Sequence, residues 1–241
     1  NNLEIKTNGD SGDTIYARVY FTTSDTSVTG PRETTDNNTD TGRDIVLGDN
    51  GKATFDSAGT LRDFISTDYD VDNATTGNFQ DTIFTGGGAD IVIAGLDHDN
   101  IRSEQGDDIV LGDNGHAVFT EESTLVDILT LAPTVGDDDT IYAHEGNDVV
   151  LGGAASDTIF TYDIDSFTAS ETGEDDIVVG DNGHVTFEND GSIETFTTTD
   201  ANTGDTDTIY TGNGSDIIAG GDSGDTIYAR VYFTTSDTSD T

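Results

Sequence analysis

The sequence contains no cysteine, methionine or tryptophan, and only 8 of its 241 residues are lysine or arginine. The absence of cysteine excludes a disulfide framework and any thiolate metal site. The scarcity of basic residues argues against nucleic acid and anionic membrane surfaces as partners, because both need basic patches. No apolar run has the length that crossing a membrane requires, and no signal-peptide pattern opens the chain. We therefore expect no membrane span, and no export signal within this window.

Acidic residues dominate the charge of the chain. Its 49 aspartates and glutamates give a formal net charge of −41. Such a charge opposes compaction unless cations neutralise it. With only 32% hydrophobic residues, the composition also fits an acidic disordered chain. We therefore expect a fold when cations are bound and disorder when they are absent.

A nine-residue repeat runs through the middle of the chain. Residues 76–120 divide into the steps TGNFQDTIF, TGGGADIVI, AGLDHDNIR, SEQGDDIVL and GDNGHAVFT. Position six is aspartate in the first four steps, position eight is always apolar, and glycine is concentrated in positions one to four. A fixed period with a carboxylate two residues before a buried apolar residue indicates a solenoid.

A longer repeat contains the short one. Residues 9–27 recur without change as residues 221–239, which is 212 positions later. This indicates a tandem array of 212-residue units, and the alternative is a duplicated end within a short protein. Because the chain begins at Asn1 without methionine, we expect a processed or excised piece of a longer protein. The unit divides into three sub-repeats of six steps: residues 202–241 continuing as 8–75, residues 76–133, and residues 134–201.

The periodicity predicts one continuous all-β fold over residues 1–241, a parallel β-roll or β-solenoid with loop insertions at the turns. Position eight is expected to face inward, with positions seven and nine facing outward. Each nine-residue step would be a half-coil and two steps one coil, so six steps would give three coils and the long repeat unit nine. At about 4.8 Å per coil, one unit would advance roughly 43 Å.

The two sheets of this roll are expected to differ on their outward faces. Odd-numbered steps present a row of threonines beside a largely aromatic row, which is acceptable in water. Even-numbered steps such as Ile91–Ile93 are apolar at all three strand positions, which is typical of a strand buried on both sides. We expect the even sheet to be covered by the chain's own insertions or by another chain, because a bare apolar patch would be an association site.

The glycine-rich turns predict metal sites. Glycine adopts backbone angles that let several carbonyls point at one place, and stacking brings the same turn of the next coil one strand spacing away. Carboxylates and carbonyls are hard oxygen donors, which suit calcium better than magnesium or a transition metal. The candidate ligands at position six are Asp13, Asp44, Asp81, Asp90, Asp99, Asp108, Asp139, Asp148, Asp157, Asp176, Asp207, Asp216 and Asp225.

These steps resemble the GGxGxDxUx nonapeptide of the repeats-in-toxin (RTX) family. Gly220–Tyr228 (GGDSGDTIY) and Thr85–Ile93 (TGGGADIVI) are close matches, and the resemblance covers about three-quarters of the chain. It implies a parallel β-roll with multiple calcium ions between adjacent turns on each edge, held by the position-six aspartates and turn carbonyls. It also implies secretion by a dedicated one-step exporter and folding outside the cell.

The fifth and sixth steps depart from the family pattern. Step five has Ala53, Ala117 or Val185 where aspartate belongs, and step six lacks the code. The aspartate of the GDNG motif in step five is either a substitute ligand or part of an Asp/Asn-Gly turn. These three aspartates are Asp49, Asp113 and Asp181. Insertions at residues 17–38 and 161–170 interrupt the turn after step three, so we expect a site there to be lost or altered.

The sequence favours a structural role over catalysis. Its four histidines lie at turn or outward positions, where we expect no metal role, and no nucleophile elbow or paired-base motif indicates an enzyme. We expect a calcium-stiffened segment of a long secreted protein, such as a filament, surface layer, matrix or adhesin stalk. Its partners would be calcium and further copies, through the apolar even sheet or end to end. The alternatives are a binding module for glycan, ice or mineral on the threonine and aromatic face, and a secretion tail of an exported enzyme.

Overall fold

The computed structural model describes residues 14–16, 42–67, 80–162 and 173–229. Every regular element in these ranges is a β-strand, and the strands form two parallel sheets and one antiparallel sheet. The predicted all-β parallel roll is therefore confirmed. None of the described residues belongs to a helix with the length and apolarity needed to cross a membrane.

The first parallel sheet, sheet A, contains the strands of steps one and three in the order β1-β5-β7-β11-β13-β17-β19. Each strand spans three residues. They are β1 (Thr14–Tyr16), β5 (Thr82–Phe84), β7 (Asn100–Arg102), β11 (Thr140–Tyr142), β13 (Thr158–Phe160), β17 (Thr208–Tyr210) and β19 (Thr226–Tyr228).

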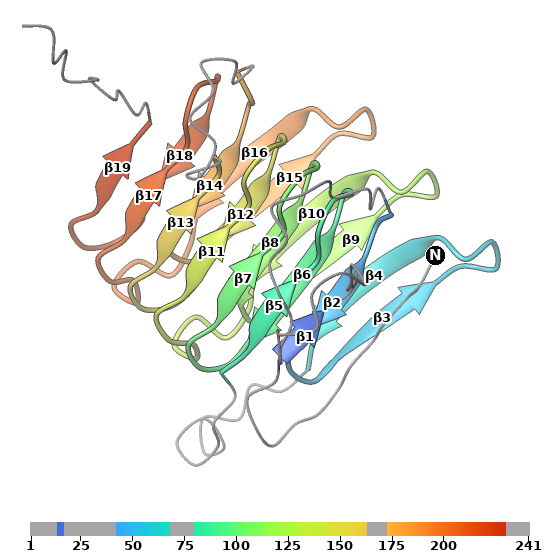
Figure 1. The fold of residues 1–241 in the computed structure, drawn as a ribbon, viewed down its shortest axis with the longest axis horizontal. Coiled ribbons are helices and arrows are strands. Elements are labelled where there is room, and N and C mark those ends of the chain that lie inside the picture. Colours follow the sequence, from blue (N-terminus) through green and yellow to red (C-terminus); the bar gives the residue numbers. More distant parts are fainter. Residues whose placement is uncertain (1–13, 17–41, 68–79, 163–172, 230–241) are drawn as a thin grey trace, which may run out of the picture.

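The second parallel sheet, sheet B, contains the strands of steps two and four in the order β18-β14-β12-β8-β6-β2. Its strands are β2 (Ile45–Leu47), β6 (Ile91–Gly95), β8 (Ile109–Asp113), β12 (Val149–Leu151), β14 (Ile177–Val179) and β18 (Ile217–Ala219). Sheets A and B together form the roll (Figure 1).

The register keeps like positions side by side. Ile83 pairs with Ile101, which lies two steps later in the sequence. Ile101 in turn pairs with Ile141, which lies four steps and a short insertion later. Position eight points into the space between sheets A and B, as predicted. The buried column formed there consists of Ile15, Val46, Ile83, Val92, Ile101, Val110, Ile141, Val150, Ile159, Val178 and Ile209, with Ala94 and Ala143 beside them.

The prediction for steps five and six is wrong. These steps do not form a third coil but an antiparallel hairpin in each sub-repeat, and the hairpins form a separate sheet C with the order β16-β15-β10-β9-β4-β3. The strands are β3 (Gly51–Phe55), β4 (Leu61–Ser66), β9 (Gly115–Phe119), β10 (Leu125–Thr130), β15 (Gly183–Phe187) and β16 (Ile193–Thr198). Ile101 and Ile141 are further apart in the sequence than Ile83 and Ile101 because a hairpin lies between their two coils.

The local sequence explains the hairpins. In β9, Gly115, Ala117 and Phe119 are buried whereas His116 and Val118 are half-buried. This two-residue alternation is typical of a strand with one covered face, and β9 is longer than the three-residue strands of sheet A. A short loop then reverses the chain, with Gly191 at φ 85° in the third hairpin, a left-handed conformation that glycine adopts without strain.

Sheet C supplies the cover that the apolar even sheet requires. The outward side chains of sheet B pack against the inner face of the hairpins and form a second core. Fully buried members include Ile91, Leu111, Phe64, Phe119 and Ile128. The face predicted as a possible association surface is therefore occupied by the chain's own hairpins, and this route to self-association is withdrawn.

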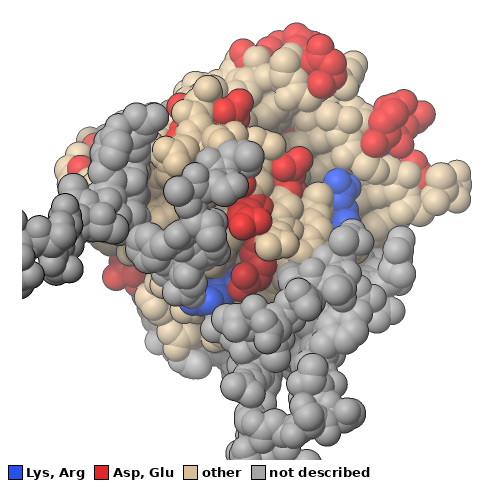
Figure 2. Space-filling view, turned by 45° about the horizontal axis from the view of Figure 1, so that its top comes forward, with Lys and Arg blue, Asp and Glu red and all other residues tan. Residues whose placement is uncertain are grey.

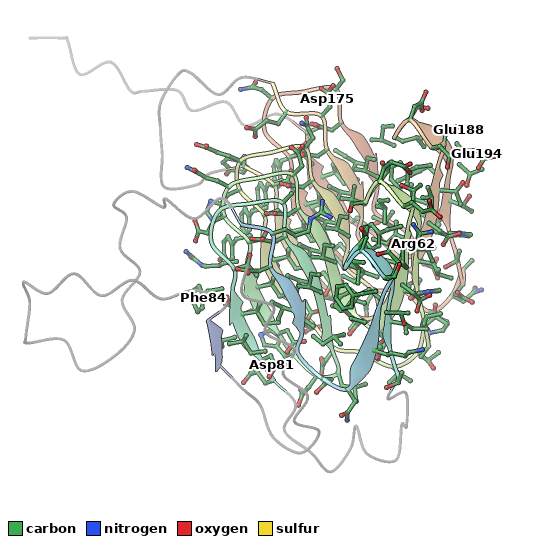
Figure 3. All side chains as sticks on the ribbon, turned by 90° about the vertical axis from the view of Figure 1, so that its right-hand side faces the viewer. Arg62, Asp81, Phe84, Asp175, Glu188 and Glu194 are labelled. Carbon is green, nitrogen blue, oxygen red and sulfur yellow. The ribbon has the colours of Figure 1, made fainter. Side chains whose placement is uncertain are left out.

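The molecule is thus a three-layer stack in which sheet B lies between sheets A and C (Figure 1). Figure 3 shows Phe84 of sheet A on one side and Glu188 and Glu194 of the third hairpin on the opposite side. Strands β1 and β19 hold the same place in successive long repeats, and sheet A advances by six strand intervals between them. At about 4.8 Å per interval this is roughly 29 Å, which replaces the predicted advance of roughly 43 Å.

The second core provides a test of the hairpin cover. Phe64 is fully buried in β4, which has a strand on each side in sheet C, whereas Phe196 holds the same repeat position in the edge strand β16 and is half-buried. We expect Phe64→Ala to lower the free energy of unfolding by about 3–5 kcal/mol, because a buried cavity is created. Phe196→Ala should cost clearly less. Urea unfolding in saturating calcium measures both, and equal losses would contradict the assigned packing.

Candidate metal centre

The position-six aspartates form two continuous ladders along the stack. In each ladder the backbone N–H of one aspartate donates to the Oδ1 atom of the aspartate in the next coil. The sheet-A ladder is Asp81, Asp99, Asp139, Asp157, Asp207 and Asp225, with N–O distances of 2.6, 2.8, 2.8, 2.8 and 3.1 Å. The sheet-B ladder is Asp44, Asp90, Asp108, Asp148, Asp176 and Asp216, with distances of 2.7, 2.8, 2.9, 3.0 and 3.2 Å.

The second carboxylate oxygen of many ladder residues is buried and has no hydrogen-bond partner. This applies to the Oδ2 atoms of Asp99, Asp139, Asp148, Asp157 and Asp207. These five side chains are at most 1% exposed. A buried, unpaired carboxylate oxygen is costly, so these atoms mark positions where a cation would supply the missing interaction.

Glycine brings backbone carbonyls to these oxygens at the edge that precedes sheet A. A side chain on Gly112, near the end of β8, would collide with Oδ2 of Asp139 and with the carbonyl oxygen of Gly152. A side chain on Gly152 would collide with Oδ2 of Asp157 and with the carbonyl oxygen of Gly180. The lack of a Cβ therefore leaves a small space lined by a carboxylate oxygen and a carbonyl, repeated from coil to coil.

The opposite edge, which precedes sheet B, has a column of carbonyls instead. Gly106 and Gly146 have φ angles of 134° and 144°, and a Cβ on either would collide with the carbonyl oxygen of the glycine in the neighbouring turn. Toward the end of this edge the carboxylates are satisfied differently. The hydroxyls of Thr161 and Thr211 donate to the Oδ2 atoms of Asp176 and Asp216, at 2.5 and 2.6 Å.

The GDNG aspartates anchor the hairpins to the roll. Oδ2 of Asp113 accepts the N–H of Ala154 in the next coil. Asp181 accepts the N–H of Asp205 at 3.1 Å and that of Asp222 at 2.6 Å. Oδ2 of Asp49 likewise accepts the N–H of Leu96 at 2.6 Å. These carboxylates therefore connect the turn that leaves the roll to turns of the following coil. The sequence had indicated either a substitute metal ligand or part of a turn at these positions, but not this anchoring role.

The structure thus brings the predicted aspartates of each ladder together within hydrogen-bonding distance of their neighbours. Asp13 lies outside the described residues. The sequence did not reveal the amide-to-carboxylate ladder itself, nor the hydroxyls of Thr161 and Thr211. A usable signal for the hydroxyls was present, since threonine or serine directly follows β5, β7, β13 and β17.

The donor set fits calcium. Within the part of the chain that the structure describes, no three carboxylates or imidazoles converge on a single metal position. Carbonyl oxygens would therefore supply most ligands, with one or two carboxylates at each position. Calcium accepts six to eight oxygen ligands, including carbonyls, in flexible geometry, whereas magnesium demands a near-ideal octahedron. Sites of this kind agree with the all-oxygen chemistry predicted from the turns.

Burial strongly perturbs the ladder carboxyls. Removal from water, together with neighbouring aspartates, raises the pKa of Asp99, Asp139 and Asp157 well above its ordinary value. Burial also raises the pKa of Asp108 and Asp207 to about 8, of Asp176 to about 7 and of the anchor Asp181 to about 6. Without cations the folded chain would therefore hold protons at neutral pH on most of these groups, but not on Asp181.

The surface is also acidic. Figure 2 shows acidic side chains spread over the visible face and few basic ones, in keeping with the net charge of −41. A long-range negative potential attracts cations to the turns and raises their local concentration. The negative potential outside the molecule and the buried carboxylate ladders inside it therefore both favour the binding of cations.

The raised pKa values predict an unusual dependence of stability on pH. In chelator, the folded chain binds more protons than the unfolded chain, whose aspartates titrate near 3.9. The resulting stability is fully present below about pH 4 and is lost as pH rises through 6 to 8, where Asp181, Asp176, Asp108 and Asp207 release protons. Far-UV circular dichroism in EDTA should show β structure at pH 4–5 that disappears toward pH 8.

A matched pair of variants isolates the buried groups. Asp108→Asn removes a raised carboxyl and should move the loss of β structure in EDTA to higher pH. Glu121→Gln changes an exposed carboxyl in the loop between β9 and β10 and should leave the midpoint in place. Stability in EDTA that increases from pH 5 to pH 8 would contradict the assigned burial of the ladders.

Comparison with known proteins agrees with this geometry. The model of the RTX calcium-binding nonapeptide repeat matches four times, over residues 66–101, 85–118, 135–161 and 202–230. No curated protein and no solved structure matches the chain. The matched residues contain β5–β8, β11–β13 and β17–β19 with their turns. RTX repeats bind multiple calcium ions and are typical of secreted proteins. The chain therefore carries RTX calcium-binding nonapeptide repeats in each of these matched ranges.

Proposed function

We propose that this segment is a calcium-stiffened structural rod in a long extracellular filament, surface layer, matrix or adhesin stalk. In this role it has no catalytic activity, and its partners are calcium and further copies of its own repeat. Calcium would turn a self-repelling acidic chain into a rod after secretion.

One observation carries this proposal. Strands β1 and β19 have the same sequence, hold the same place in successive long repeats, and occupy opposite ends of sheet A. Between them every strand is one interval further along the same axis. A unit whose repetition produces a translation along one axis builds a rod that can be extended by adding units.

The sheet-A ladder is proposed as the principal calcium edge. Its residues Asp99, Asp139, Asp157 and Asp207 have buried Oδ2 atoms without partners, and Gly112 and Gly152 open the adjoining space. In the sheet-B ladder, Asp148 is in the same condition. The anchors Asp49, Asp113 and Asp181 are proposed to act beside the ladder, since their carboxylates already accept backbone N–H groups.

Small-angle X-ray scattering on chains of one and two tandem units tests this function. In calcium the second unit should lengthen the particle by roughly 29 Å at constant cross-section, because six strand intervals are added. In EDTA at pH 8 both chains should expand into coils and lose their far-UV β signal, since the ladder charges are then unneutralised.

The control for a direct calcium effect is magnesium at equal ionic strength. Magnesium should not restore the rod, because it retains its water and requires a stricter geometry. A rod that persists in EDTA, or a second unit that packs beside the first without lengthening the particle, would refute the proposal.

A second function is favoured by the outward face of sheet A, a binding module for glycan, ice or mineral. The rings of Tyr142, Phe160, Tyr210 and Tyr228 form a stacked column, with successive centroids 4.9, 4.8 and 4.7 Å apart and planes within 3–6°. The guanidinium of Arg102 lies 4.6 Å from the centroid of Tyr142 and continues the column. A row of threonines runs beside it, so the face offers a regular array of hydroxyls and ring edges.

Replacing two rings tests the binding role. Under this alternative, the double variant Tyr142→Ala and Tyr210→Ala should abolish adsorption to the ligand surface while the calcium-induced β signal is retained. The matched control is Glu188→Ala with Glu194→Ala on the opposite side of the molecule (Figure 3), which should adsorb normally. Pull-down on glycan beads, ice or mineral particles measures adsorption, and unchanged binding of the ring variant would exclude this face.

A further inference from the structure

One aspartate of the sheet-B ladder is satisfied by a threonine of its own turn. The Oγ1 atom of Thr161 donates to the Oδ2 atom of Asp176 at 2.5 Å, and both side chains are at most 2% exposed. The Oδ1 atom of Asp176 accepts the backbone N–H of Asp148 at 3.0 Å. Both carboxylate oxygens of Asp176 therefore have hydrogen-bond partners within the protein.

The preceding coil lacks this arrangement. Strands β11 and β13 are paired, and Ala143 and Thr161 directly follow them at the same position in neighbouring coils. Ala143 and Asp148 are fully buried, and alanine has no hydroxyl to donate. Among the described residues, the Oδ2 atom of Asp148 has no hydrogen-bond partner. Two aspartates at the same repeat position thus differ in whether a hydroxyl satisfies their second oxygen.

The bond does not depend on the insertion that follows Thr161. Thr211 directly follows β17, and its hydroxyl donates to the Oδ2 atom of Asp216 at 2.6 Å. These two residues belong to one uninterrupted nonapeptide step. The same contact therefore forms within a regular turn.

A hydroxyl at this position satisfies the ladder only when it points at the carboxylate. Thr85 follows β5, but its hydroxyl donates to the carbonyl oxygen of Ser103 at 3.3 Å. Within the described ranges, neither the Oγ atom of Ser103 nor the Oδ2 atom of Asp108 has a hydrogen-bond partner. Asp108 is fully buried, so its second oxygen is open in the same way as that of Asp148.

The hydroxyl of Thr161 and a calcium ion would compete for the same place. Calcium lies about 2.3–2.6 Å from the oxygens that bind it, and the Oγ1 atom of Thr161 lies 2.5 Å from Oδ2 of Asp176. The hydroxyl also supplies, without an ion, the interaction whose absence makes a buried carboxylate oxygen costly.

We propose that Thr161 replaces calcium at Asp176, whereas the open carboxylates of Asp108 and Asp148 bind calcium on the same ladder. The nonapeptide pattern places aspartate at all three positions and therefore overestimates the number of ions on this edge. The carboxylate of Asp176 keeps its donor when calcium is scarce. This inference rests on the proposed calcium-stiffened rod and adds which turns of the rod require the ion.

Counting bound ions by native mass spectrometry after loading with calcium chloride tests the assignment. Asp148→Asn should remove about one calcium ion, because an amide nitrogen in place of the open oxygen cannot bind a cation. Asp176→Asn is the matched control at the same position of the next coil, and it should leave the count unchanged. Loss of an ion from Asp176→Asn, or an unchanged count in Asp148→Asn, would overturn the proposal.

Removing the hydroxyl gives the converse test. Thr161→Ala should add about one calcium ion, because Oδ2 of Asp176 is then as open as that of Asp148. Thr85→Ala removes a hydroxyl that donates to a carbonyl, so it should leave the count unchanged. A count that Thr161→Ala does not raise would contradict the replacement of calcium by this hydroxyl.

Far-UV circular dichroism of the same samples separates this inference from the rod function. If every variant gains its β signal in calcium but the ion counts do not differ, the assignment of individual turns fails and the rod function stands. If the unchanged chain binds no calcium, the proposed rod function fails together with this inference.

Discussion

Stacked, buried carboxylates are the constraint on which the rest of this structure depends. Each ladder aspartate lies one strand interval from the next, so two charged neighbours about 4.8 Å apart would repel by roughly 3 kcal/mol at an effective dielectric constant of 20. The N–H donated to an Oδ1 atom offsets part of this cost but leaves the Oδ2 atoms of Asp99, Asp139, Asp148, Asp157 and Asp207 unsatisfied. The fold is therefore favoured when this charge is removed, by protons at low pH or by cations at neutral pH, so we expect folding at neutral pH to require calcium.

The same stacking explains why the roll needs hairpins. A three-residue strand points only one side chain into the roll, so the core between sheets A and B is a narrow double column of valine and isoleucine. Without hairpins, the apolar outward side chains of sheet B would remain exposed to water. Hairpins inserted at one turn per sub-repeat cover that surface with Phe64, Phe119 and Phe187, and the anchors Asp49, Asp113 and Asp181 hold the inserted segments to the roll. The hairpins and the aspartates that anchor them therefore act together to bury the outward face of sheet B.

The sequence predicted the roll because its nine-residue period fixes the inward-facing, carboxylate and outward-facing positions together. Position eight indicated the inner column, position six indicated stacked aspartates but not the N–H bonds that join them, and the apolar triplets indicated that sheet B is covered. The prediction failed at steps five and six because an apolar residue lies nine positions after the phenylalanine of each step five. The nine-residue period therefore continued into the hairpins. The alternation of Gly115, Ala117 and Phe119 was a period-two signal for a longer strand, and the lost aspartate at Ala117 was a second one. The bonds from Thr161 and Thr211 to the carboxylates depend on side-chain orientation, which a sequence pattern does not specify.

A linear stack places its weakest positions at its ends. Each rung contacts only its neighbours, so an internal aspartate such as Asp139 is flanked on both sides, whereas the last rungs Asp216 and Asp225 are half-buried. Every added unit increases the number of internal rungs but leaves the number of ends at two. The average stability per unit, and with it the affinity for calcium, therefore rises with the length of the array. Repetition of a 212-residue unit is thus a physical route to a rigid rod for a sequence whose single rungs repel one another.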